Sequence, residues 1–191
     1  MTELISDWDA IVAGAGPAGS VAARQLARSG FRVLLVDQNR FPRDKVCGTC
    51  LNHQAISVLE SVGLSRVLSD SGGVELRRFR VAGWGRRADV PLPAGVAVSR
   101  SYLDAALIRS AILEGPVFRQ RTRASLTELN EDFREVTLTT LRTHETTTLR
   151  CRLLIHAAGL RPPAPRVAPS VDPTPPLPLA SPPPAPAGYP P

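Results

Sequence analysis

The stretch Asp9-Ala-Ile-Val-Ala-Gly-Ala-Gly-Pro-Ala-Gly19 decides the fold, because an apolar run leads directly into a glycine-rich turn. A helical pattern follows the glycines, and a second apolar run, Val33-Leu-Leu-Val36, ends at Asp37. Strand, glycine-rich turn, helix, strand and acidic residue, in this order, form the βαβ unit that binds a dinucleotide. The sequence therefore predicts an α/β fold with a Rossmann-like FAD/NAD(P)-binding type of domain.

The three glycines of the turn have different expected tasks. Gly14 permits the tight turn from strand to helix, Gly16 lets the backbone approach a pyrophosphate, and Gly19 lets helix and strand pack closely. The pyrophosphate then faces the helix N-terminus, whose amides and positive dipole end favour anions. Asp37 follows Gly14 by about the twenty residues that the motif requires, so its carboxylate is expected to accept hydrogen bonds from the ribose hydroxyls.

The C-terminal part of the chain has a different composition. From Leu160 onward proline dominates and hydrophobic periodicity is lost. Such a stretch cannot bury enough apolar surface to fold, and its prolines donate no backbone hydrogen bonds. We therefore expect a folded domain over residues 1–159 and a proline-rich disordered tail over 160–191.

Charge and composition exclude several classes of protein. The net charge is +6, but the arginines, Arg24 among them, are scattered and are expected on solvated faces rather than in a nucleic-acid groove. Only Arg77-Arg78 and Arg86-Arg87 occur as pairs, and weak binding to an anionic surface there is the alternative interpretation. No segment is long and apolar enough to span a bilayer, the N-terminus lacks a secretion signal, and three cysteines do not suit a secreted disulfide framework. We expect a cytoplasmic protein with no nucleic-acid partner and no transmembrane segment.

Periodicity and turn residues predict the remaining elements. Helices are expected from Pro17 to Ser29, from the N-cap Asn52 to Gly63, and from the capping-box pattern Ser101-Tyr-Leu-Asp104, with Arg100 just before its start. Two or three antiparallel strands are expected over 74–98, with Trp84 at a surface hairpin turn. A strand meander is expected over 128–154, with turns at 130–132 and 143–145.

Four motifs in this order resemble the N-terminal half of flavoprotein oxidoreductases in the geranylgeranyl reductase-like branch of the para-hydroxybenzoate hydroxylase superfamily. They are the glycine triplet, the segment Arg43-Asp-Lys-Val-Cys-Gly48, Arg100 ahead of Leu103-Asp104, and the last strand before Ala158-Gly159. The resemblance covers residues 7–159 and implies FAD as the cofactor, with NAD(P)H as a candidate reductant. It also implies an antiparallel substrate-domain sheet, to which the strands around 74–98 would belong in part.

The resemblance assigns cofactor-binding roles by position. Gly14, Gly16, Ala18 and Gly19 would hold the FAD pyrophosphate, Asp37 the adenosine ribose, Arg43 and Arg100 the phosphate and ribityl region, and Cys47, Gly48 and Gly159 would lie in the segments that contact the flavin. A guanidinium suits the phosphate because its planar fork and permanent charge match an anion. The alternative interpretations are a solvated Arg43 and an Arg100 that only supports its helix. No catalytic residue is assigned, and no metal is expected.

Two departures from the family pattern bear on activity. Ala158 stands where the family usually has an aspartate that helps to hold FAD, and after Gly159 the proline-rich tail replaces the family's Gly-Asp motif and the rest of its substrate domain. Part of the cofactor pocket is therefore expected to be missing. Our hypothesis is that the tail is a frame-shifted or truncated reading of a longer gene.

Several functions remain open at this stage. The resemblance implies a small-molecule substrate, isoprenoid or aromatic, and either the reduction of an alkene or a hydroxylation by a monooxygenase. The alternative from another class is a non-catalytic dinucleotide-binding remnant.

The cysteines add a minor alternative. Cys47-Gly-Thr-Cys50 has the spacing of a redox dithiol or of half a zinc site, but no second close-spaced pair of ligands completes a zinc site. Disulfide reductase-like flavoproteins need a second cysteine five residues after the first, and that position, counted from Cys50, is Ala55. Cys50 is therefore interpreted as a residue that packs beside a helix.

Overall fold

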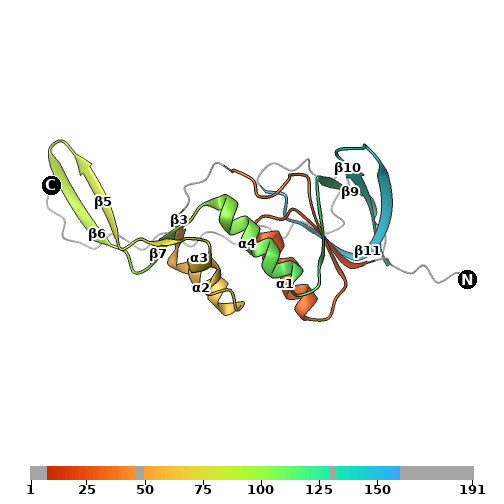
Figure 1. The fold of residues 1–191 in the computed structure, drawn as a ribbon, viewed down its shortest axis with the longest axis horizontal. Coiled ribbons are helices and arrows are strands. Elements are labelled where there is room, and N and C mark those ends of the chain that lie inside the picture. The colour runs from red at the N-terminus through yellow and green to blue at the C-terminus, as the bar shows by residue number, and fades with distance from the viewer. Residues whose placement is uncertain (1–7, 46–49, 130–131, 160–191) are drawn as a thin grey trace, which may run out of the picture.

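A mixed six-stranded sheet forms the centre of the computed structural model, which describes residues 8–45, 50–129 and 132–159. Its strand order is β8-β2-β1-β11-β10-β9. The strands are β1 (Trp8–Ala13), β2 (Val33–Asp37), β8 (Val117–Gln120), β9 (Thr122–Leu129), β10 (Arg134–Thr140) and β11 (Thr146–His156). Strands β8, β2, β1 and β11 run parallel, whereas β9 and β10 pair antiparallel in the meander. This arrangement confirms the predicted Rossmann-like α/β fold (Figure 1).

Strands β1 and β2 are covered on both faces. Helices α1 (Pro17–Arg28) and α4 (Arg100–Ile112) pack on one face, against a cluster that includes Val12 and Leu35. The meander packs on the other face, against Ile11 and Leu34. Parallel strands buried in this way consist of continuous apolar residues, which explains why β1 and β2 could be recognised in the sequence.

A smaller layer of helices and strands extends from α4. It contains α2 (His53–Ser61), α3 (Val67–Asp70) and the antiparallel strands β3 (Cys50–Asn52), β7 (Gly95–Ala97) and β4 (Val74–Glu75). Asn52 caps α2 as predicted, because its side-chain oxygen accepts a hydrogen bond from the Ala55 amide at 2.9 Å. Leu59, Leu68 and Leu103 bury this layer against α4.

The remaining pair of strands forms an arm. Strands β5 (Arg78–Gly83) and β6 (Arg86–Pro91) pair antiparallel around a turn at Trp84, and every residue in them is exposed. Figure 1 shows this hairpin projecting beyond the small layer, away from the six-stranded sheet. The antiparallel strands predicted over 74–98 are therefore present, but they are divided between two separate sheets.

The predicted start of α4 is wrong. Arg100 is the first residue of the helix rather than the residue before it, and Ser99 is the N-cap, without a side-chain hydrogen bond to the helix. The capping-box interpretation of Ser101 and Asp104 fails because the carboxylate of Asp104 binds the guanidinium of Arg100 instead. A buried carboxylate needs a charged partner more than the helix end needs a cap.

The placement of Arg24 on a solvated face is also wrong. This residue is only 7% exposed, and its guanidinium donates to the Val62 carbonyl at 2.6 Å and to the Glu114 carboxylate at 3.0 Å. It thereby joins α1 to the residues that follow α2 and α4.

Some elements were not predicted. Strand β8, strand β3 and the single-turn helix α3 are absent from the sequence-based assignment, and the meander begins at Thr122 rather than near residue 128. The turn predicted at 143–145 is confirmed, and part of the turn at 130–132 lies outside the described residues. The proline-rich tail lies outside them as well. None of the helices described has the length and apolarity needed to cross a membrane.

Candidate functional site

The glycine-rich turn after β1 is shaped by two close contacts. Gly14 has a φ of +113°, and a Cβ on it would overlap the carbonyl group of Ala157. A Cβ on Gly19 would overlap the carbonyl oxygen of Gly14. Only glycine satisfies both contacts, so these positions fix how α1 starts and how closely it approaches the strand ends.

Gly16 has a different environment from the other two glycines. Its backbone is extended, with φ −72° and ψ −176°, and the nearest atom to a Cβ added at this position would be a guanidinium nitrogen of Arg43 at 3.5 Å. The amides of Ala18 and Gly19 lie in the first turn of α1, where no intrahelical acceptor exists for them. Ala18 is exposed, so a bare, electropositive stretch of backbone faces outward here beside a cation.

Asp37 connects the end of β2 to this turn. It is 5% exposed; one carboxylate oxygen accepts a hydrogen bond from the Ala15 amide, and the other accepts from the backbone and side-chain nitrogens of Asn39, each at 2.8 Å. A carboxylate offers about four acceptor positions, so Asp37 retains capacity for one further donor. Its role toward a ribose stays a prediction, because most of its hydrogen bonds organise the loop itself.

Arg43 bridges two buried carboxylates. Its Nη1 lies 3.6 Å from Oδ1 of Asp37, and its Nε lies 3.6 Å from Oδ2 of Asp104. The guanidinium also stacks over the Phe41 ring, 4.8 Å from the ring centroid. Its side chain is 16% exposed, and its buried Nε makes no hydrogen bond with any residue that the structure describes. Arg43 is therefore held beside Gly16 with donor capacity left, and the solvated alternative is wrong.

Asp104 lies beside these residues, and the sequence analysis gave it no role in binding a cofactor. It is completely buried in α4 and accepts two hydrogen bonds from Arg100, from Nε at 3.0 Å and from Nη2 at 3.1 Å. The available signal was its position four residues after Arg100, on the same helix face as the buried Leu103 and Leu107. A charged residue on the apolar face of a helix indicates that an oppositely charged side chain lies beside it, because an unpaired buried charge is costly.

These four charged side chains form one network, Asp37–Arg43–Asp104–Arg100, which we call the charge chain. Carboxylates and guanidiniums alternate in it, so the buried charges compensate one another. The charge chain joins β2, the loop after it and α4 beside the glycine-rich turn. Its chemical consequence is that two guanidiniums stay fixed at the carboxyl end of the parallel strands, where ligands of open α/β sheets bind.

The other predicted site residues lie elsewhere or are not described. Gly159 is exposed after β11 with a φ of +94°, and the nearest atom to a Cβ there would be the ammonium nitrogen of Lys45 at 3.5 Å. The exposed Ala158 precedes it and offers no polar side chain. Cys47 and Gly48 fall outside the described residues. Their predicted roles toward a cofactor stay predictions.

The described cysteines have opposite environments. Cys50 is exposed in β3, so its interpretation as a packing residue is wrong. Cys151 is buried in β11, and burial raises the pKa of its thiol above the ordinary value. The described residues contain no group of three or more His, Cys, Asp and Glu side chains that could hold a metal ion.

We expect alkylation to distinguish these two thiols sharply. In a Cys47→Ser background at pH 8, Cys50 should react with iodoacetamide as fast as a free thiol, because it is accessible. Cys151 should react at least tenfold more slowly until the protein is unfolded, since only the thiolate is nucleophilic and its formation is disfavoured by burial. Mass spectrometry of the two peptides measures both rates. Equal rates in the folded protein would contradict the burial of Cys151.

Comparison with known proteins agrees with this geometry. The sequence profile described as "FAD binding domain" matches residues 7–170, most of the chain. The chain belongs to this FAD-binding domain family. The menaquinone reductase of Mycobacterium tuberculosis strain H37Rv is 37% identical over 161 residues, which are 81% of this chain and 38% of that protein.

Two solved structures show the same fold as this chain. A myxobacterial FAD-dependent chondrochloren halogenase matches with a TM-score of 0.71 and 24% identity, covering 82% of this chain and 38% of that one. A geranylgeranyl bacteriochlorophyll reductase-like protein from Thermoplasma acidophilum matches with a TM-score of 0.68 and 21% identity, covering 80% and 39%. The resemblance to flavoprotein oxidoreductases is thus confirmed, and the chain spans less than half the length of these relatives.

Proposed function

We propose that this chain is the FAD-binding part of a flavin-dependent oxidoreductase that reduces an alkene in an isoprenoid lipid. The observation that carries the proposal is the position of Arg43, held by two carboxylates beside the bare backbone of Gly16. A cation held beside a glycine at a helix N-terminus is suited to a diphosphate and to few other groups.

The residues of the site fit the parts of FAD. The first-turn amides of α1 and the guanidinium of Arg43 would bind the pyrophosphate, and Asp37 would offer its remaining acceptor position to the adenosine ribose. Arg100 would face the ribityl side from the start of α4. Bound FAD supplies the electron transfer, whereas these residues bind and orient it.

The nature of the substrate is inferred from the relatives. The mycobacterial relative is described as a menaquinone reductase, and menaquinone carries an isoprenoid chain. The structural neighbour from Thermoplasma acidophilum is described as geranylgeranyl reductase-like. These descriptions favour alkene reduction over the hydroxylation of an aromatic substrate, and NAD(P)H is our candidate reductant.

A non-catalytic dinucleotide-binding remnant is the second candidate function. It is favoured by Ala158, which lacks the carboxylate expected at that position. A disulfide reductase is less favoured. The residue at the position of its second cysteine is Ala55, in the first turn of α2.

Titration of the purified chain with FAD tests the proposal. We expect FAD to bind and riboflavin to bind at least tenfold more weakly, because riboflavin lacks the phosphates. Arg43→Gln should reduce the affinity for FAD by about tenfold to a hundredfold, the value of one or two charge-assisted hydrogen bonds, and leave that for riboflavin unchanged. The exposed Arg40→Gln is the matched control and should bind FAD normally.

The outcomes separate the candidate functions. Absence of FAD binding by folded protein would refute the flavoenzyme, and absence of NAD(P)H binding as well would refute the remnant. FAD that binds, is reduced by NADPH or dithionite and yields a product two mass units heavier from geranylgeraniol supports the reductase. FAD that binds but produces no reduced alkene supports the remnant.

A further inference from the structure

The ion pairs of Arg43 hold its guanidinium in place without fixing its orientation. Its distances to the carboxylates of Asp37 and Asp104 are both 3.6 Å, which is longer than a hydrogen bond. Attraction between charges at this range depends on distance and little on direction. A guanidinium binds a phosphate best through two parallel N–H groups, so the direction of its plane matters for binding. Another contact therefore has to set the orientation of Arg43.

The ring of Phe41 provides this contact. The central carbon of the Arg43 guanidinium lies over the ring, 4.8 Å from its centroid. A guanidinium at such a distance is attracted to the electron-rich face of the ring and stacks on it. The contact restricts how the guanidinium can tilt, which the two ion pairs do not. The orientation of Arg43 thus depends on where the ring of Phe41 lies.

Strand β8 holds Phe41 in two ways. The rings of Phe41 and Phe118 meet edge to face, with centroids 5.9 Å apart and planes at 70°, an arrangement that aromatic pairs prefer. The backbone amide of Phe41 donates to the side-chain oxygen of Gln120 at 3.0 Å. Phe118 and Gln120 are two residues apart in β8 and therefore lie on the same face of the strand. Both the ring and the backbone of Phe41 are fixed by this face.

The start of the loop is fixed to the same corner of the sheet. Gln120 lies opposite Asp37 in the pairing of β8 with β2. The amide of Arg121 donates to the carbonyl of Asn39 at 3.1 Å, and the side-chain and backbone nitrogens of Asn39 donate to Asp37. The loop between Asp37 and Phe41 is therefore tied down at both ends by the strands beside it.

We infer that Phe41, Phe118 and Gln120 are positioning residues, which orient the guanidinium of Arg43 toward the diphosphate of FAD. This role rests on the proposed function, because Arg43 needs a phosphate to bind. The three residues act through Arg43 and do not have to touch the cofactor. Every contact in this path joins two described residues of the domain, whichever of its surfaces a longer chain would cover.

The substitution Phe41→Leu tests the role of the ring. Leucine keeps an apolar side chain beside Phe118 but offers no aromatic face to a guanidinium. We expect the affinity for FAD to fall by about fivefold to thirtyfold, the range of a partly buried cation–π contact. The affinity for riboflavin, which has no phosphate, should stay unchanged. Phe41→Tyr keeps the ring and should bind FAD normally. Quenching of flavin fluorescence on binding measures all these affinities.

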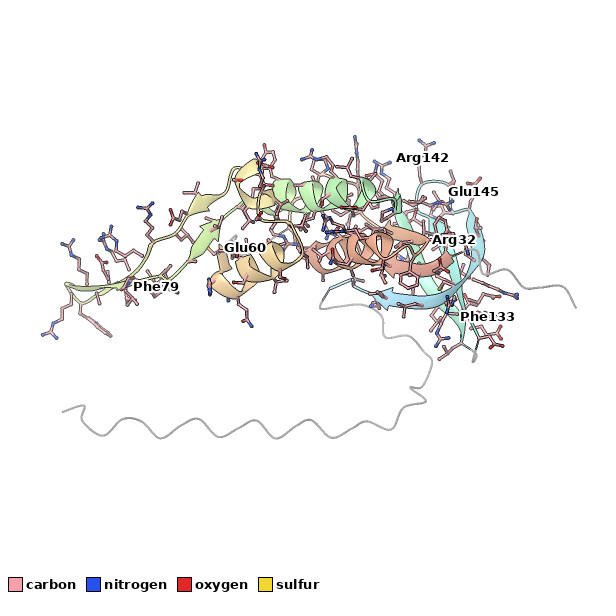
Figure 2. All side chains as sticks on the ribbon, turned by 90° about the horizontal axis from the view of Figure 1, so that it is seen from below. Arg32, Glu60, Phe79, Phe133, Arg142 and Glu145 are labelled. Atoms are coloured by element: carbon pink, nitrogen blue, oxygen red, sulfur yellow. The ribbon has the colours of Figure 1, made fainter. Side chains whose placement is uncertain are left out.

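The meander offers a matched control. There the guanidinium of Arg150 lies over the ring of Phe133, 4.4 Å from its centroid. Figure 2 shows Phe133 beside the strands of the meander. Phe133→Leu removes a contact of the same kind and should leave the affinity for FAD within about twofold of the original value.

The substitution Gln120→Met tests the same role without changing the ring. Gln120 is exposed, so the variant should fold even if Phe41→Leu does not. Loss of the hydrogen bond to the Phe41 amide should weaken FAD binding by about twofold to tenfold and leave riboflavin binding unchanged. Gln54→Met, at an exposed position of α2, is the control and should bind both as before.

A double-mutant cycle shows whether Phe41 acts through Arg43. In an Arg43→Gln background, the further change Phe41→Leu should alter the affinity for FAD by less than about twofold, because no guanidinium remains for the ring to orient. An equal loss of affinity with and without Arg43 would overturn the inference. So would an equal loss for FAD and riboflavin in Phe41→Leu or Gln120→Met, which would indicate a packing role, or a loss in Phe41→Tyr as large as in Phe41→Leu.

The outcomes also separate this role from the proposed function. If the folded chain does not bind FAD, both fail. If it binds FAD and Arg43→Gln weakens the binding, whereas Phe41→Leu and Gln120→Met do not, only the positioning role is refuted.

Discussion

Replacing Gly14 by alanine is expected to remove a large part of the free energy of unfolding of this protein. The new Cβ would overlap the carbonyl group of Ala157, and the φ of +113° is unfavourable for any residue with a side chain. Backbone strain and forced overlap each cost about 1–3 kcal/mol, and a domain of this kind is stable by only about 5–15 kcal/mol. Urea denaturation followed by circular dichroism measures the loss, which we expect at roughly 2–6 kcal/mol.

Gly16→Ala is the matched control, because it should separate binding from folding. The backbone of Gly16 is extended, and the added Cβ would meet only the flexible end of Arg43 at an ordinary contact distance of 3.5 Å. The free energy of unfolding should therefore change by less than about 1 kcal/mol. A small increase in stability is expected where alanine reduces the conformational entropy of the unfolded chain. The affinity for FAD should fall by at least tenfold, because the methyl group occupies the surface that a pyrophosphate would approach.

The two results together test the interpretation of the turn. Equal destabilisation by both substitutions would mean that Gly16 is needed for packing, and that its proximity to Arg43 has no bearing on a ligand. Normal FAD affinity in a folded Gly16→Ala protein would exclude this surface as the pyrophosphate site.

The βαβ unit was predictable because its determinants are local in sequence. The apolar runs of β1 and β2 are buried on both faces, so no polar residue interrupts them. Gly14 and Gly19 are required because a Cβ at either position would overlap backbone atoms of the turn or of the neighbouring strand end. The same holds for α2, whose N-cap Asn52 bonds to Ala55 three residues later. Interactions of this range leave a pattern that periodicity and turn chemistry detect.

The missed features depend on contacts between distant parts of the chain. Strand β8 is a strand because its backbone pairs with β2, more than eighty residues earlier in the sequence, and its residues alternate too little to indicate this. Arg24 is buried because the carbonyl of Val62 and the carboxylate of Glu114 reach it from two other segments. Composition places an arginine at the surface, and only the tertiary structure supplies the partners that allow its burial.

The candidate site was predictable in its parts but not in its connections. The glycines and Asp37 were assigned from the spacing of the motif, and Arg43 and Arg100 by resemblance, each to a different part of a cofactor. The structure joins the three charged residues through Asp104, which had no assigned role. The connection could not be seen in the sequence because the loop that carries Arg43 approaches α4 only in the folded chain.

Removal of the charge on Asp104 is expected to be the most damaging change in the charge chain. Asp104→Asn keeps the shape of the side chain but leaves the guanidiniums of Arg43 and Arg100, which are only 16% and 17% exposed, without this carboxylate. Breaking a buried ion pair from one side costs about 3–5 kcal/mol. In urea denaturation we expect the loss of stability to lie near the lower end of this range, because both guanidiniums keep some contact with water. Asp70→Asn, at an exposed position of α3, should change stability by less than about 0.5 kcal/mol.

A double-mutant cycle shows whether the effect passes through Arg100. Asp104→Asn and Arg100→Gln remove the two ends of the same bidentate pair, so the double variant should lose less stability than the sum of the single variants, with a coupling of about 1–3 kcal/mol. In the folded fraction, Asp104→Asn should weaken the binding of FAD more than that of riboflavin, because the carboxylate positions Arg43, whose guanidinium we propose to bind the phosphates. Additive losses of stability would show that Asp104 and Arg100 do not act as a pair. An equal loss of affinity for FAD and riboflavin would show that Asp104 supports the packing of α4 and does not act on the phosphates. The proposed phosphate-binding role of Arg43 would then not depend on Asp104.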